Sequence, residues 1–120
     1  MKLIADIAVA IVALQHVAFF VLESFLWTKP VGRRVFGLSK ELTAATASLA
    51  LNQGVYNAFL AAGLVWGLLA GPDGFQIKVF FLSCVVVAGI VGGMTARRSI
   101  LLIQAVPGLV ALVLVWLAHR

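Results

Sequence analysis

The stretch VFFLSCVVVAGIV, residues 79–91, contains no charged side chain. Working outward, the apolar character extends over residues 76–96, close to the roughly 20 residues that a helix needs to cross a bilayer core about 30 Å thick. Three other segments have the same character, at residues 3–27, 42–70 and 100–118. The sequence therefore predicts an all-α integral membrane four-helix bundle, built as a single four-span transmembrane domain over residues 1–120.

The composition excludes an ordinary soluble domain. Hydrophobic residues make up 63% of the chain and charged residues only 11%, whereas about a quarter of a soluble domain is charged. The single cysteine, Cys84, excludes an intrachain disulfide and a cysteine-rich metal site. The net charge of +5 comes from basic residues in short connections instead of a continuous basic face. We therefore expect the lipid bilayer as a partner, and no nucleic acid.

The distribution of basic residues predicts an orientation. The first and third connections hold six of them: Lys29, Arg33, Arg34, Lys40, Arg97 and Arg98. The two ends and the second connection hold three: Lys2, Lys78 and Arg120. Because cytoplasmic connections carry an excess of lysine and arginine, we expect a multi-pass protein of the plasma (inner) membrane with both termini outside.

The connections between the apolar segments carry turn-forming residues. They are TKPVGRRVFGLSKE (28–41), GPDG (71–74) and ARRS (96–99). We expect these connections to be water-exposed turns. Ser39 is the predicted N-cap of the second helix, with Glu41 in its first turn. Asp6 lies near the expected outer surface, where pairing with Lys78 would account for its charge.

Two glycine pairs have the four-residue spacing that places both members on one helix face, Gly63/Gly67 and Gly89/Gly93. Such faces allow a neighbouring backbone to approach closely. We expect them to pack within the bundle. The alternative is a homo-oligomer that forms through one of these faces.

Polar side chains gather on the first and second apolar segments. His16 and Glu23, seven residues apart, fall within about 20° of each other on a helix. The second segment contributes four strong hydrogen-bonding side chains within NQGVYN: Asn52, Gln53, Tyr56 and Asn57. Gly63 and Gly67 lie on the same helix face as Asn52 and Tyr56. Because lipid can neither form hydrogen bonds with polar groups nor use the space beside a glycine, we expect this face to point into the bundle.

The last segment adds Gln104, followed by Pro107. A proline removes one backbone donor and frees a carbonyl about one turn earlier, so we expect a kink there. Together these positions predict a polar pocket open toward the inner leaflet. Its predicted lining is His16, Glu23, Asn52, Gln53, Tyr56, Asn57 and Gln104.

Chemistry in such a pocket is limited to proton transfer and polar recognition. Glu23 and His16 are the candidate catalytic residues, as acid or base. The other five side chains are candidate binding residues, and no metal or cofactor is expected. Purely structural alternatives remain open: the amides and Tyr56 can join helices, His16 can simply be hydrogen-bonded, and Glu23 can form a salt bridge with Arg97 or Arg98.

The chain resembles a known family in His16, Glu23, LWTKPVGRRVFGL (26–38) and LNQGVYNAFLAAGLVWG (51–67). These features are similar to the domain-of-unknown-function 1304 family of small bacterial four-helix integral membrane proteins. The resemblance covers nearly the whole chain. It implies a single-domain inner-membrane protein and brings no established activity.

Three functional hypotheses follow. In the first, the pocket binds a small lipophilic ligand with a polar head, with or without transforming it by acid/base chemistry; four-helix membrane enzymes that act on lipophilic substrates are a general analogy. In the second, the chain is a small proton-coupled transporter of the multidrug-resistance size class, which also places a glutamate in its first helix. In the third, it is an accessory subunit of a larger membrane complex.

Overall fold

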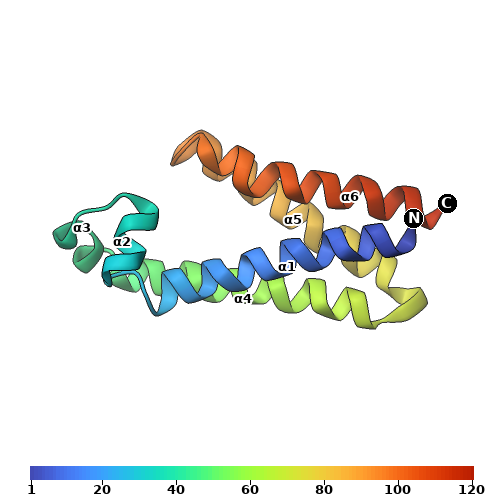
Figure 1. The fold of residues 1–120 in the computed structure, drawn as a ribbon, viewed down its shortest axis with the longest axis horizontal. Coiled ribbons are helices and arrows are strands. Elements are labelled where there is room, and N and C mark those ends of the chain that lie inside the picture. The colour runs from blue at the N-terminus through green and yellow to red at the C-terminus, as the bar shows by residue number, and fades with distance from the viewer. The chain divides into compact units, whose positions relative to one another are not determined.

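A computed structural model describes residues 1–120, and every regular element in it is helical (Figure 1). The all-α prediction is therefore confirmed. The elements are α1 (Lys2–Ser24), α2 (Pro30–Phe36), α3 (Lys40–Ala45), α4 (Ala47–Leu69), the 3₁₀ turn η1 (Gly71–Asp73), α5 (Gly74–Thr95), the π-helical turn η2 (Leu101–Ala105) and α6 (Val106–His119).

Three stretches of helix are long and apolar enough to cross a membrane: Lys2–Ser24, Gly71–Thr95 and Leu101–His119. Helix α4 also has 23 residues, but its Asn52, Gln53 and Asn57 make it less apolar than the others. The structure thus confirms membrane-spanning character for three of the four predicted segments. A fourth crossing by α4, and the orientation of the termini, stay predictions.

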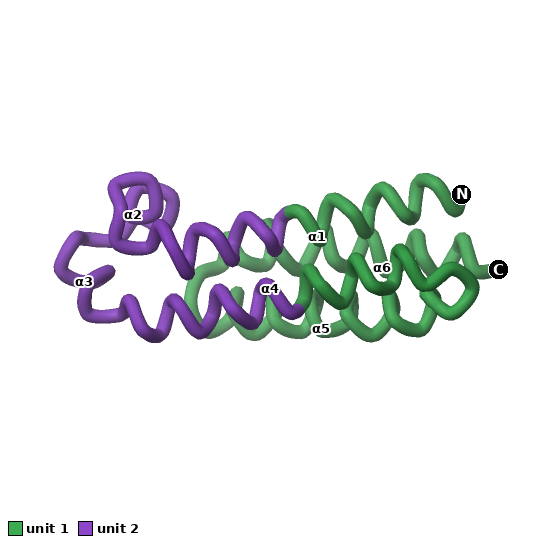
Figure 2. Tube along the Cα trace, turned by 90° about the horizontal axis from the view of Figure 1, so that it is seen from below, with its two compact units in different colours: residues 1–14, 60–120 green, residues 15–59 purple.

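The chain divides into two compact units (Figure 2). Unit 1 comprises residues 1–14 and 60–120, and unit 2 comprises residues 15–59. Helices α1 and α4 each contribute one part to each unit.

The core of unit 1 is apolar and is built from four helices. Its buried residues come from α1, α4, α5 and α6: Ala5, Val9, Val12, Ala13, Leu64, Leu82, Val85, Ala111 and Val115. Large apolar side chains also cover the outside of this unit, such as Leu69 at 80% exposure and Met94 at 78%. Apolar residues both inside and outside are what a helical unit surrounded by lipid requires.

The glycine pairs pack within the chain, as predicted. A Cβ atom on Gly89 would lie 2.6 Å from the backbone nitrogen of Ala105, so α5 and η2 meet backbone to backbone there. Gly93 similarly faces Leu101, and Gly63 faces the ring of Phe81. A homo-oligomer that used these same faces would have to replace the contacts within the chain.

Replacing Gly89 with valine is expected to destabilise the protein by about 3 kcal/mol, the upper end of ordinary overpacking costs. The added Cβ would meet the nitrogen and Cα of Ala105 at 2.6 and 2.8 Å, and backbone atoms cannot move aside as a flexible side chain can. Unfolding in a mild detergent measures the change. Gly92→Val is the matched control because the nearest neighbour of a Cβ atom there, 3.1 Å away, is the side-chain methyl of Ile100. Equal losses in the two variants would contradict this packing.

The first connection is more ordered than the predicted water-exposed turn. Residues 30–36 form helix α2, which starts with Pro30 in its first turn and ends at Gly37 with φ 66°. A proline at the start and a left-handed glycine at the end are typical helix boundaries. The expectation of a plain turn is therefore wrong here, because Pro30 and Gly37, which are common in turns, are the boundaries of one short helix.

The predicted second helix is confirmed in its cap but interrupted after one turn and a half. The Ser39 hydroxyl accepts a hydrogen bond from the backbone of Leu42 at 3.1 Å, as an N-cap should. At Thr46, with φ −111° and ψ 11°, the backbone leaves the helix and separates α3 from α4. The Thr46 hydroxyl donates to the Leu42 carbonyl at 2.8 Å and accepts from the Trp27 indole at 3.0 Å. These two bonds hold the break in place.

The distortion expected near Pro107 takes the form of a π-helical turn. Residues 101–105 form η2, and the backbone N–H of Val106 bonds to the carbonyl of Leu101. This bond reaches one residue further back than in an α-helix. The irregular turn therefore lies just before the proline, which occupies the first turn of α6.

Candidate functional site

Within unit 2, the end of α1 and the start of α4 are joined by two hydrogen bonds. The amide of Asn57 donates to the Glu23 carboxylate, Nδ2 to Oε1, at 2.5 Å. The Ser24 hydroxyl donates to the carbonyl of Leu51 at 3.3 Å. Gly54 lies between these two bonds along α4, where a Cβ atom would be 3.1 Å from the carbonyl oxygen of Phe20. The missing side chain lets the two helices approach closely enough for both bonds to form.

The Glu23–Asn57 pair is the part of the predicted site that the structure brings together. Both residues are partly buried, and they come from helices 34 positions apart in the chain. An amide that donates to one carboxylate oxygen fixes the plane of the carboxyl group and leaves the other oxygen available. The Asn57 amide therefore holds the Glu23 carboxylate in one orientation, while a catalytic role for Glu23 stays a prediction.

The other polar residues of NQGVYN do not point into the interior. Asn52 and Gln53 are exposed on this chain, and Tyr56 is 56% exposed, with its ring 6.2 Å from that of Phe59. The prediction that their face points inward was wrong. Helix α4 instead buries Ala50 and Gly54 and turns Asn57 toward Glu23. Residues 50, 54 and 57 are spaced by four and then three positions, so they lie on one face of the helix. Small residues allow the closer approach, so they occupy the contact and the larger amides lie outside it.

His16 is fully enclosed, with an exposed fraction of 0%. Its ring meets that of Phe19 edge-on, with 5.4 Å between the centroids. Along the helix axis His16 lies about 10 Å from Glu23, at 1.5 Å per residue. Burial of His16 agrees with its predicted inward direction, while its catalytic role stays a prediction.

Gln104 belongs to unit 1, where it lies partly buried in the π-helical turn η2. Arg97 and Arg98 belong to the same unit. The predicted meeting of Gln104 with Glu23, and the alternative salt bridge from Glu23 to an arginine, therefore stay predictions. The partner that the structure gives the Glu23 carboxylate is the Asn57 amide.

The pairing of Asp6 with Lys78 is confirmed in unit 1. The Lys78 ammonium lies 3.1 Å from Asp6 Oδ1, and the Lys2 ammonium lies 2.7 Å from Oδ2. These residues border a cavity that the sequence analysis missed, lined also by Phe75 and His119. Its members lie far apart in the chain, so no spacing pattern connects them. The one signal in the sequence that pointed to this region was the charge of Asp6, which requires a cation as its partner. No group of three or more histidine, cysteine, aspartate or glutamate side chains has a metal-ligating arrangement.

The long apolar helices define a helical membrane protein, in which a carboxyl–amide pair joins two helices. The chain belongs to the family described as "Protein of unknown function (DUF1304)", whose sequence model matches residues 10–116. It is also similar to "Uncharacterized protein YpaA" of Lactococcus lactis subsp. lactis (strain IL1403), with 26% identity over 115 residues that cover 94% of this chain and 97% of that protein. No solved structure matches the chain. The family resemblance expected from the sequence is confirmed, and these descriptions name no activity.

Proposed function

We propose that this protein spans the inner membrane four times, with both termini outside, and binds a small lipophilic molecule with a polar head. The proposed site is the polar face of α4 beside the Glu23–Asn57 pair. The observation that carries the proposal is the exposure of Asn52, Gln53 and Tyr56 on an otherwise apolar helix.

A fourth crossing by α4 fits its length and its surroundings. Its 23 residues extend about 35 Å, enough for the hydrocarbon core. Leu64 of this helix is fully buried in the same core as residues of α1, α5 and α6, three helices with membrane-spanning character. Crossing by α4 also puts the two arginine-rich connections on one side, as the positive-inside rule requires.

Exposed amides in a membrane helix require an occupant. Each amide or hydroxyl without a partner in hydrocarbon costs several kcal/mol. A molecule whose polar head offers donors and acceptors would satisfy Asn52, Gln53 and Tyr56 together. Its apolar tail could lie against Phe59, which is 61% exposed one helical turn beyond Tyr56.

If the protein also transforms the bound molecule by acid/base chemistry, Glu23 is the reactive group. Asn57 orients its carboxyl group, and an oriented carboxyl group can exchange a proton with a bound polar head. Glu23→Gln should then remove turnover of the molecule while the protein remains folded. Movement of protons or hydrophobic cations into proteoliposomes would support the transporter hypothesis instead.

Native mass spectrometry of the mildly extracted protein is expected to show a retained small molecule, and Gln53→Leu should reduce its occupancy about tenfold. One lost hydrogen bond of about 1.4 kcal/mol corresponds to that factor. The matched control is Gln76→Leu, which removes another exposed amide, from α5 in unit 1.

Two outcomes would overturn the binding proposal. One is a bare chain whose mass is unaffected by either substitution. The other is a second protein in fixed ratio that Gln53→Leu releases, because the polar face would then belong to the subunit of a larger complex.

A further inference from the structure

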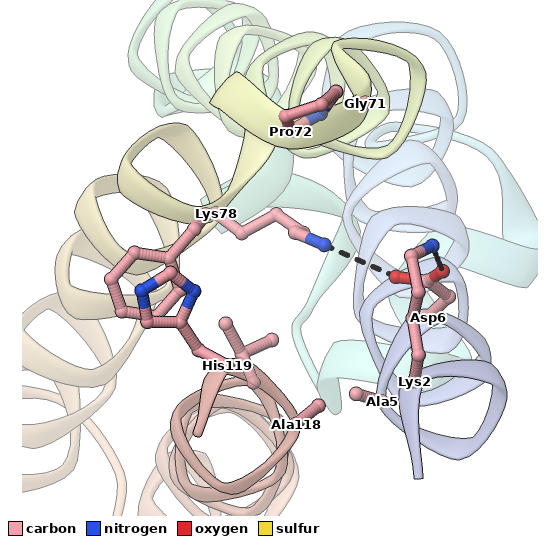
Figure 3. A pocket seen from close by; sticks show the side chains of 10 residues that line it. Lys2, Ala5, Asp6, Gly71, Pro72, Lys78, Ala118 and His119 are labelled. Carbon is pink, nitrogen blue, oxygen red and sulfur yellow. Dashed lines mark hydrogen bonds and ion pairs between the residues drawn. The ribbon is translucent and has the colours of Figure 1, made fainter.

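A second polar site lies in unit 1 and shares no residue with the Glu23–Asn57 pair or with the polar face of α4. It is a cavity of about 150 Å³ at the end of the unit where α1 and α5 begin and α6 ends. Its lining includes Lys2, Asp6, Phe75, Lys78 and His119. In Figure 3 the Lys78 side chain extends across the cavity from α5 to Asp6 on α1. His119 of α6 lies near the α5 end of this side chain, across the cavity from Asp6.

The cavity has more positive than negative charge. Asp6 is the one carboxylate in its lining, and two ammonium groups share it: Lys2 at 2.7 Å and Lys78 at 3.1 Å. Two positive charges against one negative charge leave a net charge of about +1 on these three groups. A singly charged anion would balance it.

Lys78 has unused hydrogen-bonding capacity in a buried position. Only 9% of the residue is exposed. An ammonium has three N–H donors, and the bond to Asp6 uses one of them. Buried donors of a charged group are costly without acceptors, so two donors at the edge of a cavity favour a ligand rich in acceptor oxygens.

The aromatic residues beside the cavity place it at the membrane–water boundary. The His119 ring stacks on Phe75 with centroids 3.6 Å apart, and Trp116 meets Phe75 edge-on at 5.0 Å. Tryptophan near the end of a membrane helix is typical of the head-group level. The cavity also lies at one end of each of the three membrane-spanning stretches. Its depth therefore matches that of lipid phosphates.

We propose that this cavity binds a singly charged phosphate group, with Lys78 and Lys2 as the charged donors. Lysine is a common phosphate ligand, and one phosphate group fits a net charge of about +1. The phosphate can come from the head group of an anionic lipid or from free phosphate. This site is independent of the ligand proposed for the polar face of α4.

The test titrates the purified full-length protein in a neutral detergent with three compounds and follows its melting temperature. The compounds are short-chain phosphatidylglycerol, short-chain phosphatidylcholine and inorganic phosphate. We expect phosphatidylglycerol to raise the melting temperature at concentrations about tenfold lower than phosphatidylcholine, whose choline cancels the phosphate charge. A rise with inorganic phosphate alone would identify free phosphate as the source.

Variants assign the effect to the cavity. Lys78→Gln should weaken phosphatidylglycerol binding about tenfold, and Lys78→Arg should keep it. Lys2→Gln gives a second test if Lys78→Gln fails to fold, since the Lys2 side chain is 77% exposed. Arg34→Gln, which removes the same charge from unit 2, is the matched control.

Asp6→Asn separates anion binding from a purely structural role. Removing the negative charge should strengthen phosphatidylglycerol binding, although it also removes both ion pairs and lowers stability. Equal responses to the anionic and zwitterionic lipids, without a response to inorganic phosphate, would overturn the proposal. So would an equal loss of binding in Lys78→Gln and Arg34→Gln, or weaker binding in Asp6→Asn.

Discussion

Replacing Gly54 with leucine is expected to lower the free energy of unfolding by roughly 4 kcal/mol, the sum of overpacking and of two weakened hydrogen bonds. A Cβ atom at this position would collide with the Ser24 hydroxyl and lie 3.0 Å from the backbone nitrogen of Ser24. The α1 backbone cannot move aside locally, so α1 and α4 must separate. The bonds from Asn57 to Glu23 and from Ser24 to Leu51 would then lengthen together.

Ala62→Leu is the matched control for this substitution. It places the same side chain on an exposed residue of α4 that the proposed site does not use, and it should leave the stability nearly unchanged. Denaturant titration in mixed micelles measures both variants. The proposed ligand should also be lost from Gly54→Leu, because Glu23 is no longer held by Asn57. A Gly54→Leu protein as stable as Ala62→Leu would show that the two helices do not meet closely at this point.

Local signals in the sequence predicted several features correctly. Ser39 caps α3 because a serine just before a helix offers its hydroxyl to the first free backbone N–H groups. Asp6 pairs with Lys78 because a carboxylate at the end of a membrane helix requires a cation nearby. The pairs Gly63/Gly67 and Gly89/Gly93 pack against other helices. This could be predicted because the four-residue spacing puts both glycines on one helix face and their small size lets a neighbouring helix approach.

The direction of the polar face of α4 could not be predicted in the same way. Helical periodicity shows that Asn52 and Tyr56 share a side, but it does not say which side a neighbouring helix covers. That choice depends on packing against α1, where Gly54 fits and a glutamine or tyrosine would not. Only Asn57, at the edge of the contact, reaches Glu23.

The cavity of unit 1 lay beyond sequence reasoning for a different reason. Its residues come from both ends of the chain and from the start of α5. One pair, Asp6 and Lys78, was predicted from charge alone. The addition of Lys2, Phe75 and His119 depends on how three helix ends converge in unit 1, which no local pattern specifies.

We expect α4 to cross the membrane together with the three more apolar stretches. Single cysteines at Thr28, Asp73 and Ser99, in a Cys84→Ser background, would report the side of each connection. All three positions are exposed, and none of these changes alters the count of lysines and arginines on which the orientation rests.

The decisive measurement is labelling of these cysteines in intact spheroplasts with a membrane-impermeant maleimide. We predict complete labelling of Asp73→Cys from outside, with Thr28→Cys and Ser99→Cys labelled only after the membrane is opened. Labelling of Thr28→Cys and Asp73→Cys from the same side would mean that α4 does not cross, and the proposed site on its polar face would lose its basis.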